Sequence, residues 1–165
     1  MTDRRRYHPS DSSDRHWQRL LQYALGKADT FECAIPYPVV LQDLAHAPLW
    51  PTALQAFRRN LIDRHASVIR WELRRDYATQ FVRFQLTAPL LNYIRSFPQL
   101  EAWRWDYGAP EDPAFFSGEA VLLATESAQG RIAVYADAAE LAALTGAGIR
   151  LLEPLGVTAE PWPTP

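Results

Sequence analysis

The spacing of apolar residues first predicts a helix near the N-terminus. Trp17, Leu20, Leu21 and Ala24 fall at positions i, i+3, i+4 and i+7, which places them on one face of a helix. Ser13 stands just before this run. A serine side chain at that position can accept a hydrogen bond from a backbone N–H group of the first turn. The pattern therefore predicts an amphipathic helix that begins near Ser13.

Alternation of apolar and polar residues predicts a hairpin in the middle of the chain. Segments 69–74 and 81–86 both alternate, which is the pattern of strands with one buried and one exposed face. We expect residues 75–79 to join them. A helix that continues from Leu54 is the alternative, but it would place Glu72 on the apolar stripe of that helix.

Shorter patterns predict the remaining elements. The first three are a strand over residues 30–35, a helix that opens at Pro51 and buries Leu54, Phe57 and Leu61, and a helix capped by Thr87. A hairpin of residues 119–126 and 131–136 follows, with its turn at Gly130. The chain then forms a helix that starts with a capping box from Asp137 to Glu140, and an extended segment over residues 149–157. The middle of the first strand holds Cys33, which we expect to point into the core.

These elements predict an α+β domain. Its antiparallel sheet is built from two hairpins plus an N-terminal strand, with about four helices packed on one side. We expect residues 1–13 to form a disordered tail, residues 14–157 a single domain, and residues 158–165 a proline-rich tail. No glycine-rich phosphate loop follows a predicted strand, which argues against the common nucleotide-binding folds.

Composition supports one soluble domain. The chain has 165 residues, of which 48% are hydrophobic and 22% charged. The single cysteine excludes a disulfide framework within the chain. The longest run without a strongly polar residue, from Cys33 to Leu41, is shorter than the roughly 20 residues of a membrane span. No apolar stretch follows the charged N-terminus, so we expect a cytoplasmic protein without membrane association.

Charge is unevenly distributed along the chain. Residues 1–107 hold 15 basic and 11 acidic residues, whereas residues 108–165 hold 2 basic and 8 acidic residues. Arg70, Arg74 and Arg83 on the outer faces of the first hairpin form a candidate nucleic-acid patch. The negative net charge and the neighbouring glutamate favour instead a solvated face with cross-strand ion pairs, so we do not favour nucleic-acid binding.

Residues typical of catalysis or metal binding do not form a motif. A structural zinc site needs about four nitrogen or sulfur ligands. The chain offers one cysteine and four histidines without ligand spacing: His8, His16, His46 and His65. No serine lies in a Gly-x-Ser-x-Gly elbow. We therefore expect no catalytic, metal or cofactor-binding residue, and no enzymatic activity.

The aromatic loop of residues 103–113 is the strongest candidate for a binding surface. Large rings alternate there with charged residues, a composition that is typical of protein–protein hot spots. The candidate partner-binding residues are Trp103, Arg104, Trp105, Asp106, Tyr107, Glu111 and Asp112. Two alternatives remain open: the rings fill the edge of the core, or they surround the two acids and form a small-molecule or catalytic site.

The last third of the chain resembles a group of small, uncharacterised bacterial α+β proteins. The likeness rests on the Pro-x-Asp-x-x-Phe-Phe segment of residues 110–116, the strand at 120–125 and the Gly-Ile-Arg-Leu-Leu segment at 148–152. Some of these proteins carry the labels sporulation-related or toxin-immunity-like. Members often have His-Glu in the turn after the first hairpin strand, where this chain has Ser-Ala-Gln-Gly at 127–130. The departure argues further against an enzyme.

Together these patterns favour a non-catalytic cytoplasmic protein that acts by binding another protein. Neutralisation of a toxin is one version, which the acidic last third of the chain and the resemblance support. The alternatives are a small-molecule-binding protein or enzyme with a site under residues 103–113, and a weak nucleic-acid binder. A homo-oligomer is compatible with the sequence.

Overall fold

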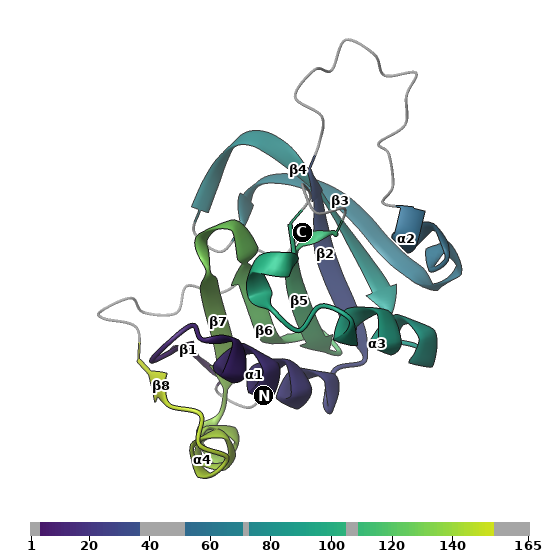
Figure 1. Ribbon diagram of the computed structural model, residues 1–165. Coiled ribbons are helices and arrows are strands. Elements are labelled where there is room, and N and C mark those ends of the chain that lie inside the picture. Colours follow the sequence, from purple (N-terminus) through teal and green to yellow (C-terminus); the bar gives the residue numbers. More distant parts are fainter. Residues whose placement is uncertain (1–3, 37–51, 71–72, 105–108, 154–165) are drawn as a thin grey trace.

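The computed structural model describes residues 4–36, 52–70, 73–104 and 109–153. Eight strands form one antiparallel sheet over these residues, in the order β3-β4-β2-β5-β6-β7-β1-β8 (Figure 1). The strands are β1 (Arg5–Pro9), β2 (Thr30–Pro36), β3 (Leu61–Arg70), β4 (Leu73–Gln85), β5 (Glu111–Ser117), β6 (Ala120–Glu126), β7 (Arg131–Ala136) and β8 (Leu151–Leu152). The helices are α1 (Asp14–Leu25), α2 (Thr52–Gln55), α3 (Ala88–Arg95) and α4 (Ala138–Gly146), with 3-10 turns η1 (Arg58–Asn60), η2 (Leu100–Ala102) and η4 (Ser127–Gln129). The expected α+β class is therefore confirmed.

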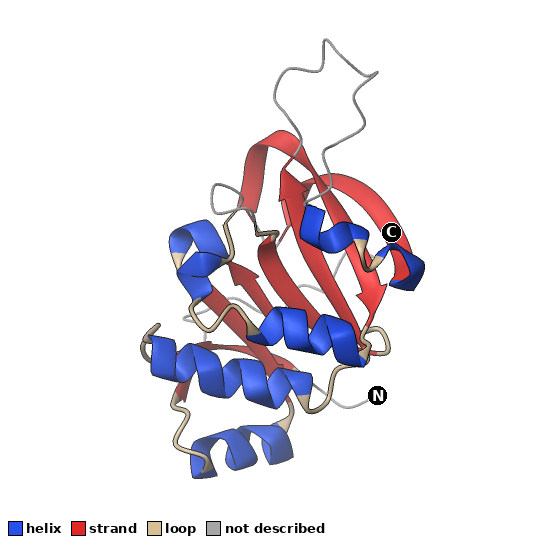
Figure 2. Cartoon of the chain, turned by 45° about the vertical axis from the view of Figure 1, so that its right-hand side comes forward, coloured by secondary structure: helices blue, strands red, loops and turns tan. Residues whose placement is uncertain are grey.

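Helices α1 and α3 cover one face of the sheet (Figure 2). The core lies between these layers, where alternate residues of the central strands point toward the helices and are buried. Phe31 and Cys33 of β2 belong to this core, together with Trp17 of α1 and Leu90 of α3. Cys33 thus points inward as expected. No helix among the described residues has the length and apolar character required to cross a membrane.

The opposite face of the sheet also holds buried side chains. Glu32 of β2 is only 2% exposed and lies beside Arg83 of β4, with the Arg83 Nη2 atom 3.0 Å from Glu32 Oε2. The same guanidinium lies 3.9 Å from the centre of the Phe116 ring. A buried carboxylate requires such a partner. This ion pair explains how a charged residue is accommodated in the middle of the sheet.

The N-terminal segment departs from the expected disordered tail. Residues Arg5–Pro9 form β1, which lies between β7 and β8 in the sheet. Tyr7 pairs with Val134 and is buried in the core. Tyr7 is the only buried residue of this short strand. The segment therefore carries no hydrophobic repeat long enough to predict a strand.

The first hairpin is displaced from its expected position. β3 already begins at Leu61, and the expected turn over residues 75–79 lies within β4. Ile69 pairs with Arg74 and Arg70 pairs with Leu73, so the two strands are paired up to these residues. The alternative of a helix that continues from Leu54 is also wrong. β3 is an edge strand whose residues 62–65 are all exposed, so it shows no alternation of apolar and polar residues.

The helices match the expectation in part. Three described helices have eight or more residues, whereas the helix expected from Pro51 shortens to the single turn α2. The expected capping box of α4 is confirmed: the Glu140 N–H donates to Asp137 Oδ1 over 2.9 Å, and the Asp137 N–H donates to Glu140 Oε2 over 3.1 Å. Ser13 precedes α1 but does not cap it, because its hydroxyl donates to Asp11 instead.

Candidate functional site

Trp103, the first aromatic residue of the 103–113 loop, is not accessible to a partner. Trp103 is completely buried, with its ring centre 4.8 Å from that of Phe97 and 5.8 Å from that of Phe31. Aromatic rings at these separations stabilise a core. Trp103 therefore belongs to the packing between the sheet and α3, and the core interpretation of this ring is correct. Trp105, Asp106 and Tyr107 lie outside the described residues.

Asp112 is likewise a structural residue. It is only 2% exposed, and it exchanges two hydrogen bonds with Ser127: the Asp112 N–H donates to Ser127 Oγ over 2.9 Å, and the Ser127 N–H donates to Asp112 Oδ1 over 2.8 Å. These bonds join the start of β5 to η4. Arg104 and Glu111 are half-buried. The predicted surface is therefore not a continuous exposed patch in the described part of the chain.

Of the three arginines in the candidate patch on the first hairpin, the structure describes the side chain of Arg83 alone. Arg83 is engaged by Glu32 and by the Phe116 ring. The side chains of Arg70 and Arg74 lie outside what the structure describes. Arg83 is therefore not part of a solvated basic face.

One cluster at the start of α1 contains the residue types of a catalytic triad. His16 Nδ1 lies 2.6 Å from Asp11 Oδ1 and 3.2 Å from Ser13 Oγ. In a working triad the serine and the carboxylate contact opposite nitrogens of the imidazole. Here both contact the same nitrogen, and the Ser13 hydroxyl itself donates to Asp11. The cluster orders the N-terminus of α1 rather than activating a nucleophile.

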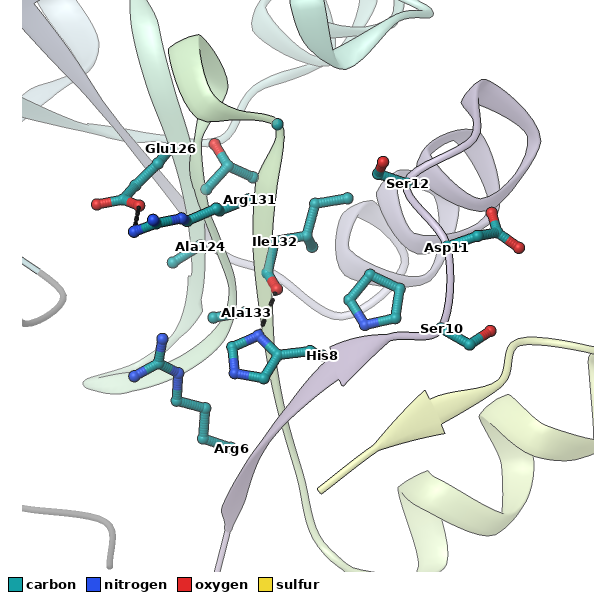
Figure 3. A pocket seen from close by; sticks show the side chains of 13 residues that line it. Arg6, His8, Ser10, Asp11, Ser12, Ala124, Glu126, Arg131, Ile132 and Ala133 are labelled. Carbon is teal, nitrogen blue, oxygen red and sulfur yellow. Dashed lines mark hydrogen bonds and ion pairs between the residues drawn. The ribbon is translucent and has the colours of Figure 1, made fainter. Parts of the chain in front are cut away.

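A groove of about 460 Å³ opens where two neighbouring strands separate. β1 pairs with β7 from Arg5 to Tyr7, and then pairs with β8 at His8 and Pro9. The chain thus leaves β7 after Tyr7, and residues 8–12 form one wall of the groove while residues 130–133 form the other. We call this feature the β1–β7 groove. Arg6, His8 and Ala133 of its lining alternate with core residues and lie on the face opposite the helices, whereas the core residue Ile132 and residues 10–12 extend the lining toward α1 (Figure 3).

Small side chains form the floor of the β1–β7 groove. Ala124 of β6 and Ala133 of β7 are directly opposite each other in the sheet. Figure 3 shows Arg6 and His8 on one side of these alanines, with Glu126 and Arg131 on the other. The hollow therefore results from a cross-strand pair of alanines between longer polar side chains.

His8 is held in a defined orientation in the groove. Its Nδ1 atom lies 3.1 Å from the carbonyl oxygen of Ile132 (Figure 3). A carbonyl oxygen can only accept, so Nδ1 carries the hydrogen and donates it. The imidazole therefore lies beside β7, directly after the last residue of β1 that pairs with β7. In the neutral ring, Nε2 is then an acceptor.

The charged groups of the groove differ in their accessibility. The Arg131 side chain is 59% exposed, whereas Glu126, whose Oε2 atom lies 3.4 Å from Arg131 Nη1, is 13% exposed. Asp11 lies at the end of the groove, and Figure 3 shows it beside α1. Its carboxylate accepts from the Ser13 hydroxyl and backbone N–H, and these bonds, together with His16, hold the pKa of Asp11 below its ordinary value.

The sequence analysis did not predict this groove. Arg6 and His8 fell in the expected tail, and Glu126 and Arg131 were recognised only as the ends of the second hairpin. The alternation of Arg6, Tyr7 and His8 was the available signal, but three residues are too few to establish a strand. Among the described residues, no group of three or more histidine, cysteine or acidic side chains is placed to hold a metal ion.

Comparison with known proteins adds no relative. No family model, no curated protein and no solved structure matches the chain. The function must therefore be inferred from the geometry of the chain itself.

Proposed function

We propose that the protein acts without catalysis, by binding another protein through the β1–β7 groove. The observation that carries this proposal is the separation of β1 from β7 after Tyr7, which leaves a groove with charged walls between residues 8–12 and β7. Paired strands support the floor of the groove, and the bond from His8 to the Ile132 carbonyl fixes that side chain before a partner arrives. Such preorganisation lowers the entropic cost of association.

The lining of the groove favours a protein partner over a small molecule. Small-molecule sites are enclosed and are lined mostly by apolar and aromatic side chains. The apolar contribution here comes from four aliphatic residues without any aromatic ring, namely Ala124, Ala133, Ile132 and Pro9. The rest is polar and includes two arginines and two carboxylates. Interfaces between proteins commonly use such arginine-containing polar surfaces.

The bonding of the titratable groups supports a binding role. His8 uses Nδ1 on the Ile132 carbonyl, and Asp11 accepts three hydrogen bonds from its own segment and α1. A general base must instead lie within reach of the proton that it abstracts, with a nucleophile beside it. Neutralisation of a toxin in the cytoplasm is one form of this proposal, and the resemblance of the last third of the chain supports it.

A groove-filling substitution tests the proposal. The purified protein is used as bait in an extract of the source organism, next to Ala133→Leu, which fills the groove floor, and Ala142→Leu, which makes the same change on the exposed surface of α4. We expect a stoichiometric partner with the unmodified bait and with Ala142→Leu, and its loss with Ala133→Leu. Circular dichroism confirms that each variant is folded.

Two results would overturn the proposal. One is the absence of any stoichiometric partner. The other is equal recovery of a partner by Ala133→Leu and the unmodified protein, because the groove would then play no part in binding.

A further inference from the structure

We propose that the β1–β7 groove binds an acidic segment of its protein partner, with Arg131 as the main electrostatic contact. This inference rests on the proposed function, since it names the chemistry of the partner at the same site. It follows from the unequal exposure of the charged groups and from the fixed orientation of His8.

Arg131 is more exposed than the carboxylate that it contacts, and Asp11, which is 51% exposed, is bonded to Ser13 and His16. Arg131 is 59% exposed, and its contact with the largely buried Glu126 spans 3.4 Å and uses only Nη1. A guanidinium has five N–H donors in a planar fork. Arg131 therefore retains donors for a second carboxylate, and a bidentate contact of this kind is strong and directional.

The carboxylates of the groove are already engaged. Asp11 accepts hydrogen bonds from Ser13 and lies 2.6 Å from His16. Glu126 faces Arg131 from the neighbouring strand. Arg6 adds a second guanidinium from the opposite wall of the groove. The two carboxylates thus already use acceptor positions within the chain, whereas Arg131 keeps donors for a second carboxylate, which favours an acidic segment over a basic one.

His8 adds a second requirement. Because Nδ1 donates to the Ile132 carbonyl, Nε2 of the neutral ring accepts a hydrogen bond from the ligand. Each glutamate of an extended peptide carries a backbone N–H group near its carboxylate. Such a peptide supplies both a carboxylate for Arg131 and a donor for His8, whereas a free dicarboxylate supplies only the carboxylates. The geometry therefore favours a peptide over a small acid.

An NMR titration tests the inference. The probes are hexaglutamate, hexaglutamine and free glutarate, added to the ¹⁵N-labelled full chain, and amide shifts report both the site and the affinity. We expect saturable shifts at the groove-lining residues of β1 and β7 with hexaglutamate, and none with hexaglutamine or glutarate. Arg131→Gln should weaken hexaglutamate binding about tenfold, the loss of one charge-assisted contact. The matched change Arg95→Gln, on exposed α3, should leave it unchanged.

Each other outcome has a distinct meaning. Equal binding of hexaglutamine, or no effect of Arg131→Gln, overturns the preference for acidic segments. Glutarate that binds as tightly as hexaglutamate assigns the groove to small carboxylic acids and overturns the assignment to a protein segment. Loss of the captured partner in Ala133→Leu without any binding of hexaglutamate leaves the proposed function intact and overturns only this inference.

Discussion

The backbone at Asp112 allows a prediction in which glycine is better than alanine. Asp112 has φ +50°, the only positive φ of a non-glycine residue in the described chain. Its carboxylate accepts the Ser127 N–H, which joins the start of β5 to η4. We therefore compare Asp112→Gly with Asp112→Ala. Both variants lose the carboxylate, and they differ only in how well the new residue tolerates a left-handed backbone.

The expected difference can be worked out from two contributions. Loss of the carboxylate leaves the buried Ser127 N–H without its acceptor, which costs about 1–3 kcal/mol in either variant. Alanine adds about 1 kcal/mol, since its Cβ is crowded in the left-handed region. Glycine does not carry this cost. We therefore expect the free energy of unfolding of Asp112→Gly to exceed that of Asp112→Ala by about 1 kcal/mol.

Urea denaturation followed by circular dichroism measures this difference at neutral pH. Ala114, two residues away in the same strand and with an ordinary negative φ, serves as the control site. There the sign is reversed: Ala114→Gly should lose about 0.5–1 kcal/mol or more, because glycine costs more entropy and packs less surface. If Asp112→Ala proved as stable as Asp112→Gly, the argument from backbone strain would be refuted.

Three further predictions concern the buried charge pair, the α4 capping box and β1. Arg83→Met leaves Glu32 buried without its ion-pair partner and should lower the free energy of unfolding, measured by urea denaturation, by about 3–5 kcal/mol. Adding Glu32→Met to the same chain should recover most of this loss. A double variant as unstable as Arg83→Met would contradict this expectation. Burial alone would raise the pKa of Glu140, but hydrogen bonds from Lys27 and the Asp137 backbone and the charge of Arg4 hold this pKa below its ordinary value. The ionised Glu140 side chain therefore stabilises the fold at neutral pH, and this stabilisation falls as the pH drops below about 4.3. The stability gap between the unmodified chain and Glu140→Gln, followed by urea denaturation across this range, should narrow on acidification; a constant gap would refute the assignment. Tyr7→Ala should lower the free energy of unfolding by about 3–5 kcal/mol, whereas Ser12→Ala should change it little. If both variants were equally stable, Tyr7 would lie in a disordered tail and not in β1.

The sequence predicts those elements whose pattern is set by a buried face. α1 buries one face, so its apolar residues repeat with the helical period, whereas β2 and the β6–β7 hairpin are short, mostly apolar runs with consecutive buried residues. The capping box of α4 was predicted because both of its hydrogen bonds are made between residues three apart in the chain. Such local signals do not depend on the rest of the fold.

The sequence does not predict elements that depend on tertiary neighbours. β3 lies at the edge of the sheet with residues 62–65 exposed, so neither face imposes a repeat on it. Trp103 and Asp112 have the composition of a binding loop, yet long-range contacts bury both. Their partners, Phe31 and Ser127, are distant in the chain, and no local pattern indicates these contacts.

The feature that concealed β1 in the sequence also gives the groove its character. A strand between two others normally needs several apolar residues, but β1 buries only Tyr7 and places Arg6 and His8 on the opposite face. β1 makes few apolar contacts because it leaves β7 after Tyr7 and pairs with β8 over just two residues. A longer, more apolar strand would continue along β7 and close the gap beside Ile132 that His8 now spans. The weak hydrophobic pattern of this segment is therefore a condition for the groove to exist.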